Sequence, residues 1–131
     1  MAKLKRALGQ VARELVVLLV DDEPAYLESI GQLLSRDPVR LRHARSGLHA
    51  LEILSSEDIA LVVADYWMIG MDGVTLLNEV QRLYPSVGRV LLTGAPDSEI
   101  VVEAKAHKVL TKNMRPELIR QSILREARRK S

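Results

Sequence analysis

The chain has 131 residues and a formal net charge of +2; 47% of its residues are hydrophobic, 27% are charged, and it contains no cysteine. This length suits a single domain, and the composition is that of a folded globular protein. The lack of cysteine excludes disulfides, thiolate metal sites and a cysteine nucleophile, and we expect a cytoplasmic protein.

The first predicted element is a strand at residues 15–20, a run of six apolar residues that no other run in the chain exceeds. This run is far shorter than the roughly 20 residues that span a bilayer, so we expect no membrane contact. Continuous apolar runs of this kind are typical of strands buried on both faces of a parallel sheet. Residues 24–35 predict a helix with proline in its first turn, and residues 39–43 alternate apolar and basic side chains, as an edge strand does.

Residues 46–55 carry leucines on one helical stripe and predict the second helix. Residues 59–64 form another apolar run, which indicates a second buried strand. Residues 73–84 have helical periodicity that Pro85 ends, and a shorter apolar strand is expected at residues 89–92.

The last part of the chain predicts a short helix from residue 97 to about 106, a short edge strand at residues 108–111 and a helix from residue 116 to about 128. Strands and helices therefore alternate along the chain. This alternation indicates an α/β fold with a doubly wound, five-stranded parallel sheet and helices on both faces.

The net charge is divided unevenly along the chain. Residues 1–13 hold four basic residues and no acidic one, and residues 115–131 hold six basic and two acidic ones, which leaves −6 on residues 14–114. We interpret 1–13 as a basic N-terminal extension, 14–128 as the domain and 129–131 as a basic C-terminal end. The ends are either solvated tails or contacts to an acidic partner, lipid headgroups or nucleic acid, although nothing else in the chain indicates nucleic-acid binding.

Polar residues follow four of the predicted strands. Asp21 and Asp22 follow the first, Asp65 the third, Thr93 the fourth and Lys112 the fifth. The carboxyl ends of parallel strands meet at one edge of the sheet, so these side chains are expected to converge there. Carboxylates that lie close together repel each other, so either their pKa values rise or a cation neutralises them. A set of ligands that are all oxygen atoms favours Mg²⁺. The alternative is a set of isolated aspartates that cap loops and helices.

Four segments carry a family resemblance: residues 17–24, 63–73, 90–94 and 110–112. In these segments the chain resembles the receiver domain of two-component response regulators, the CheY-like family. The resemblance implies the flavodoxin-like strand order 2-1-3-4-5.

The resemblance also implies a mechanism. Asp65 would accept a phosphoryl group from the phosphohistidine of a sensor histidine kinase, with Lys112 and Thr93 contacting the phosphoryl oxygens. The protein would act on no other substrate and would signal to an output domain or effector protein, with a homodimer as a further option. The implied Mg²⁺ ligands are Asp21, Asp22, Asp65 and the backbone carbonyl of Trp67.

Several positions depart from the family pattern. Asn113 follows Lys112 where the family has a cis-proline; a cis peptide before a non-proline residue costs about 2.5–4 kcal/mol, so we expect a trans peptide. Val109 stands at the position of the aromatic residue that accompanies switching, and Ile69 replaces a proline. Lys112 follows Thr93 by 19 positions, a few fewer than usual, which predicts a short or irregular fourth helix.

Trp67 stands two residues after Asp65, and Ala95 stands two residues after Thr93. In the family that this chain resembles, these two positions help to control the attack of water on the phosphoaspartate. We hypothesise that these side chains hinder hydrolysis and lengthen the phosphorylated lifetime. The alternative is that Trp67 packs on the rim with no kinetic effect.

Two other functions stay open. One is an interaction module that has lost phosphorylation-dependent switching, suggested by Val109, Asn113 and the short fourth helix. The other is a small Mg²⁺-dependent phosphatase that uses Asp65 as its nucleophile. Such an enzyme needs a second acid two residues later, where this chain has Trp67.

Overall fold

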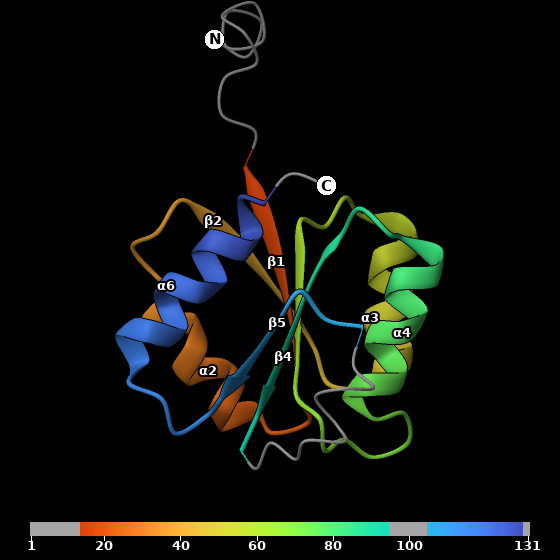
Figure 1. Ribbon diagram of the computed structural model, residues 1–131, viewed down its shortest axis with the longest axis horizontal. Coiled ribbons are helices and arrows are strands. Elements are labelled where there is room, and N and C mark those ends of the chain that lie inside the picture. The colour runs from red at the N-terminus through yellow and green to blue at the C-terminus, as the bar shows by residue number, and fades with distance from the viewer. Residues whose placement is uncertain (1–13, 95–104, 130–131) are drawn as a thin grey trace, which may run out of the picture.

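The computed structural model describes residues 14–94 and 105–129 (Figure 1). The predicted basic extension at 1–13 and residues 130–131 lie outside this part, so the proposed domain boundaries stay predictions. Within the described residues, no helix combines the length and the apolar character that crossing a bilayer requires.

The strands with the most buried residues form the middle of a five-stranded parallel sheet, because neither of their faces meets water. The sheet has the order β2-β1-β3-β4-β5, which confirms the predicted fold class and strand order. The strands are β1 (Leu15–Val20), β2 (Val39–Ala44), β3 (Leu61–Ala64), β4 (Gly88–Thr93) and β5 (Lys108–Thr111).

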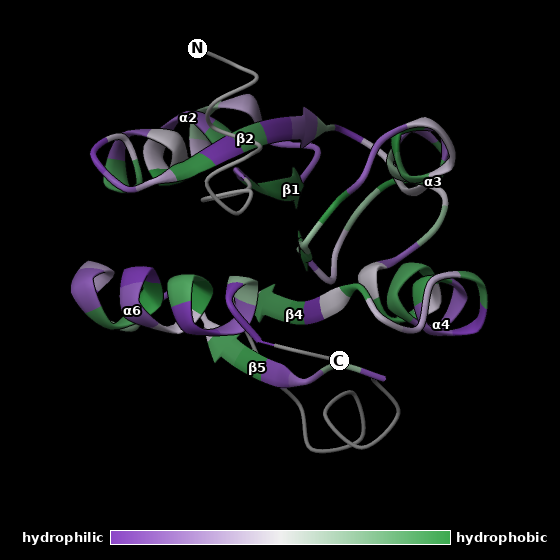
Figure 2. Ribbon diagram, turned by 90° about the horizontal axis from the view of Figure 1, so that it is seen from above, coloured by the Kyte–Doolittle hydropathy of each residue, from purple (hydrophilic) through white to green (hydrophobic). Residues whose placement is uncertain are grey.

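Helices cover both faces of the sheet (Figure 1). Helices α2 (Pro24–Leu33) and α6 (Pro116–Ala127) lie on one face, and α3 (Gly47–Ser56) and α4 (Gly73–Leu83) lie on the other. Alternate residues of β1 point into the two resulting cores, since side chains of a strand alternate between its faces. Figure 2 shows the hydrophobic β1 between the layers and the mixed hydrophobic and hydrophilic β2 at the edge.

The observed bounds differ from the prediction at a few places. β3 begins at Leu61 rather than at residue 59, and Ile59 is buried in the core without belonging to the strand. Its apolar character reflects burial, which periodicity alone does not distinguish from a strand. β4 extends one residue beyond the prediction at each end. A fourth helix is expected from residue 97 to about 106, and most of this range lies within residues 95–104, outside the described part of the chain.

The first turn of α4 packs directly on the backbone of Asp65. Asp72 caps this helix by accepting a 2.8 Å hydrogen bond from the Thr75 N–H, and the Gly73 N–H donates to the Tyr66 carbonyl at 2.9 Å. A Cβ added at Gly73 would lie 2.2 Å from the Asp65 carbonyl oxygen. Only a residue without a side chain allows α4 to start this close to the end of β3.

We therefore predict opposite effects for two glycine substitutions. Gly73→Ala forces α4 away from Asp65 and should lower the free energy of unfolding by about 1–3 kcal/mol, as overpacking does. Gly31→Ala in α2 is the matched control, because its added Cβ meets no atom closer than 3.9 Å and alanine is favoured in a helix by up to about 1 kcal/mol. Urea unfolding of both variants measures the difference. An unchanged Gly73→Ala stability would contradict this packing.

Candidate functional site

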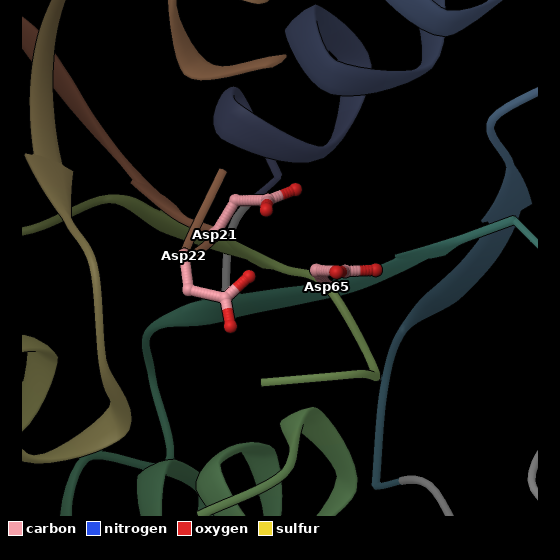
Figure 3. Close-up of side chains that lie close together, drawn as sticks. All are labelled: Asp21, Asp22 and Asp65. Carbon is pink, nitrogen blue, oxygen red and sulfur yellow. The ribbon is translucent and has the colours of Figure 1, made fainter. Parts of the chain in front are cut away.

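Three carboxylates meet at the carboxyl edge of the sheet (Figure 3). Asp21 and Asp22 follow β1, and Asp65 follows the neighbouring β3. Each offers a carboxylate oxygen, and these oxygens all lie within 4.8 Å of one another. Asp21 and Asp65 are buried and Asp22 is partly exposed, so the cluster opens to solvent on one side.

The sheet itself holds two of these aspartates in place. The Asp65 N–H donates a 2.9 Å hydrogen bond to the Val20 carbonyl, and the Asp21 N–H donates a 3.1 Å bond to the Ala44 carbonyl. Both bonds continue the pairing between strands one residue past their ends. The backbone of each carboxylate-bearing residue is thus fixed by its neighbouring strand rather than by a loop.

The side chains of the two consecutive aspartates have different partners. Asp21 Oδ1 accepts a 2.9 Å bond from the Glu23 N–H at the start of α2. Asp22 Oδ2 accepts a 3.2 Å bond from the Ile69 N–H, which ties the loop between β3 and α4 to the end of β1. A sequence pattern could not reveal this second contact, because the two residues are 47 positions apart.

Lys112 brings the opposite charge to the cluster. Its Nζ lies 2.8 Å from Asp21 Oδ2 and 3.4 Å from Asp65 Oδ1, so the two buried carboxylates share one ammonium. Its backbone N–H donates to the Thr93 carbonyl at 2.8 Å, which joins the ends of β4 and β5. The predicted convergence of Asp21, Asp65 and Lys112 is present in the fold.

The electrostatics follow from burial and from these partners. Burial raises the pKa of Asp65 and the nearby charge of Asp21 raises it further, against opposing contributions from Lys112 and a backbone hydrogen bond of Tyr66. Burial lowers the pKa of Lys112, but its hydrogen bond to Asp21 and the charges of both carboxylates outweigh burial and raise it. The ammonium is therefore held in its charged form.

Tyr26 contacts Lys112, and the sequence analysis did not predict this contact. Its ring lies in the first part of α2, and the Lys112 Nζ lies 4.0 Å from the ring centroid. Burial, followed by the charges of Asp21 and Asp65, raises the pKa of the Tyr26 hydroxyl to about 12. No local pattern could pair residues 26 and 112, which only the fold brings together.

Thr93 and Trp67 also lie at the carboxyl ends of strands, on β4 and after β3. Thr93 is fully buried at the end of β4. Trp67 follows Asp65 in the loop to α4, with its side chain 67% exposed and its ring 4.8 Å from the ring of Tyr66 in an edge-on arrangement. The role of the Trp67 carbonyl as a metal ligand stays a prediction, and Ala95 lies outside the described residues.

The family departures have specific surroundings in this fold. The described residues contain no cis peptide bond, which confirms the trans peptide expected between Lys112 and Asn113. The Asn113 side-chain oxygen accepts a hydrogen bond from the Thr111 hydroxyl and closes the turn after β5. Val109 is partly buried and packs against the core beneath α3 and α4.

The cluster has the donor set of a site for a hard divalent cation. Its three carboxylates carry more negative charge than Lys112 balances, and every offered ligand atom is an oxygen. Carboxylate oxygens with one solvent-facing side suit Mg²⁺, which keeps several water ligands. The residues present therefore fit the metal that the sequence suggested.

Comparison with known proteins gives a consistent result. The family model described as response regulator receiver domain matches residues 17–124. The transcriptional regulatory protein GlrR of Escherichia coli K12 is 32% identical over 110 residues, which cover 82% of this chain and 25% of GlrR. The chain thus spans about a quarter of the length of this curated relative. Sporulation initiation phosphotransferase F of Bacillus subtilis is 25% identical over 100 residues, 76% of this chain and 81% of that protein.

Solved structures agree with the sequence comparison. The signal receiver domain of an HD domain-containing protein from Pseudomonas fluorescens Pf-5 has a TM-score of 0.82 and 34% identity, covering 88% of this chain and 94% of that one. A CheY-like receiver domain protein from Methanospirillum hungatei JF-1 has the same fold, with a TM-score of 0.82 at 24% identity over 88% of this chain and 94% of that one. The chain therefore belongs to the response regulator receiver domain family of two-component systems.

Proposed function

We propose that Asp65 accepts a phosphoryl group from the phosphohistidine of a sensor histidine kinase, and that phosphorylation changes how the domain binds an output domain or effector protein. One observation carries this proposal. The Asp65 carboxylate lies within 4.8 Å of two further carboxylates and 3.4 Å from the Lys112 ammonium. A nucleophile beside a potential metal site and a fixed cation is the arrangement that phosphoryl transfer requires.

In the transfer step, a carboxylate oxygen of Asp65 attacks the phosphorus atom while the bond between phosphorus and the histidine nitrogen breaks. The products are a mixed anhydride on Asp65 and a histidine whose nitrogen recovers the electron pair. Lys112 pairs with a phosphoryl oxygen, and the Thr93 hydroxyl contacts another. The charge at this edge of the sheet changes when the phosphoryl group arrives, which is the local event that biases partner binding.

Mg²⁺ is the metal ion that we propose for this site. Asp21, Asp22, Asp65 and the Trp67 carbonyl would hold it, and it would supply positive charge against the carboxylates and the incoming phosphoryl oxygens. The all-oxygen donor set and the excess of negative charge over Lys112 support this assignment.

We further propose that the protein turns over no external substrate. A phosphatase with Asp65 as its nucleophile needs a second acid two residues later, and the residue there is Trp67. The interaction module without switching remains the competing function, because Val109 replaces the aromatic residue of the family pattern. A homodimer, a cytoplasmic location and the role of the basic ends stay predictions.

The first prediction concerns phosphorylation itself. Incubation with acetyl phosphate and Mg²⁺ should add one phosphoryl group to the protein, as measured by intact-protein mass spectrometry. Asp65→Asn should abolish this gain because an amide oxygen is a far weaker nucleophile. Asp58→Asn is the matched control, since Asp58 precedes β3 at the opposite end of the sheet and should be phosphorylated at the wild-type rate.

Two results would contradict the proposal. A mass gain in the Asp65→Asn variant would place the acceptor elsewhere. The absence of any gain in the wild-type protein would favour the interaction module.

Removal of Mg²⁺ with a chelator should slow the reaction to near the rate of the Asp65→Asn variant, because the carboxylates would then repel the incoming phosphoryl oxygens.

The second prediction concerns the lifetime of the phosphorylated state. Trp67→Asn should shorten this lifetime several-fold, because the small polar side chain admits and orients water next to the anhydride on Asp65. Loss of the phosphoryl group is followed by mass spectrometry after the phosphate donor is removed. Ile69→Asn is the control, since Ile69 is 88% exposed in the same loop. Equal lifetimes for wild type and Trp67→Asn would show that Trp67 has no kinetic effect.

A further inference from the structure

We propose that Tyr26 is a positioning residue whose ring holds the Lys112 ammonium over the carboxylate cluster, within reach of Asp65. The inference deepens the proposed function, because it depends on Lys112 contacting the phosphoryl group. In this chain Asn113 follows Lys112 in a trans peptide, so the proline that follows this lysine in the family pattern is absent.

The contact has the geometry of a cation–π interaction. The Lys112 Nζ lies 4.0 Å from the centroid of the Tyr26 ring, well within the roughly 6 Å over which an aromatic face attracts an ammonium. The same nitrogen lies 2.8 Å from Asp21 and 3.4 Å from Asp65. The ammonium thus has carboxylates and an aromatic face as neighbours, and its side chain is only 20% exposed.

The ring stands on a rigid element. Tyr26 lies in the first turn of α2, where its N–H donates to the Glu23 carbonyl at 3.1 Å, and its side chain packs against the core beneath α2 and α6. The Glu23 N–H in turn donates to Asp21 Oδ1. The helix that carries the ring is therefore fixed to the same aspartate that accepts a hydrogen bond from Lys112.

The hydroxyl of Tyr26 takes no part in this contact. It is buried, and no hydrogen-bond partner for it exists among residues 14–94 and 105–129. The raised pKa of about 12 keeps it protonated, so the ring adds no negative charge to the cluster. A phenylalanine ring should therefore position Lys112 as well as tyrosine does, whereas an aliphatic side chain should not.

The experiment compares rates of phosphorylation by acetyl phosphate with Mg²⁺. Tyr26→Phe should react at the wild-type rate, and Tyr26→Leu should react about 5- to 30-fold more slowly, the range expected from the loss of a cation–π contact. Replacement of Tyr26 by fluorinated phenylalanines should slow the reaction progressively with each added fluorine, because fluorine withdraws charge from the ring face with little change in shape. A role in packing alone would not produce this trend.

A double-mutant cycle tests whether Tyr26 acts through Lys112. In the Lys112→Met background, which keeps the length of the side chain without its charge, Tyr26→Leu should cause no further loss of rate. Urea unfolding identifies a variant that fails to fold. Fluorescence of Trp67, the chain's only tryptophan, reports Mg²⁺ binding and checks that the cluster of Tyr26→Leu stays intact.

A measurement without phosphorylation separates this inference from the proposed function. The ring should shift the NMR signals of the Lys112 ε-methylene protons upfield in the wild type and in Tyr26→Phe, and Tyr26→Leu should remove the shift. If the shift is present but the wild type gains no phosphoryl group, the proposed function fails and the placement of Lys112 stands. Three results would overturn the inference. They are absence of the shift in the wild type, a wild-type phosphorylation rate in Tyr26→Leu, and a Tyr26→Leu substitution that slows the Lys112→Met variant as much as it slows the wild type.

Discussion

Repulsion among the carboxylates of Asp21, Asp22 and Asp65 is the constraint on which this fold depends. Their oxygens lie within 4.8 Å of one another, a distance at which like charges oppose the folded state. The pairing of the buried strands β1 and β3 offsets this repulsion. It continues through Asp65 and fixes this residue beside the end of β1. The ammonium of Lys112 then offsets part of the charge from the far side of β4.

The segments around the cluster contact it from both faces of the sheet. The Ile69 N–H of the loop after β3 donates to Asp22, and α4 begins against the backbone of Asp65 because Gly73 has no side chain. On the other face of the sheet, α2 contacts the cluster through Glu23 and Tyr26. Helix α2 therefore contacts side chains of the cluster, and α4 contacts the backbone of Asp65, so elements from both helix layers meet at the same residues.

The sequence predicted what depends on local patterning, and failed where distant segments meet. Continuous apolar runs located the central strands, and the polar residues that follow the strands placed Asp21, Asp65 and Lys112 at their carboxyl ends. The strand order came from the family resemblance, since alternation leaves several orders possible. Two contacts of Lys112 depend on how helices and strands pack, which no spacing in the chain encodes. Its ammonium lies over the ring of Tyr26, and it lies closer to Asp21 than to Asp65.

The strand order also has a consequence for how the chain assembles. After β1, each later strand adds to an edge that already exists: β2 and β3 on either side of β1, then β4 on β3 and β5 on β4. A chain synthesised from its N-terminus can therefore build the sheet outward, without opening a pairing already made. Asp21 and Asp65 precede Lys112 in the chain, so the strand that comes last brings the ammonium that balances part of the charge of the two earlier carboxylates.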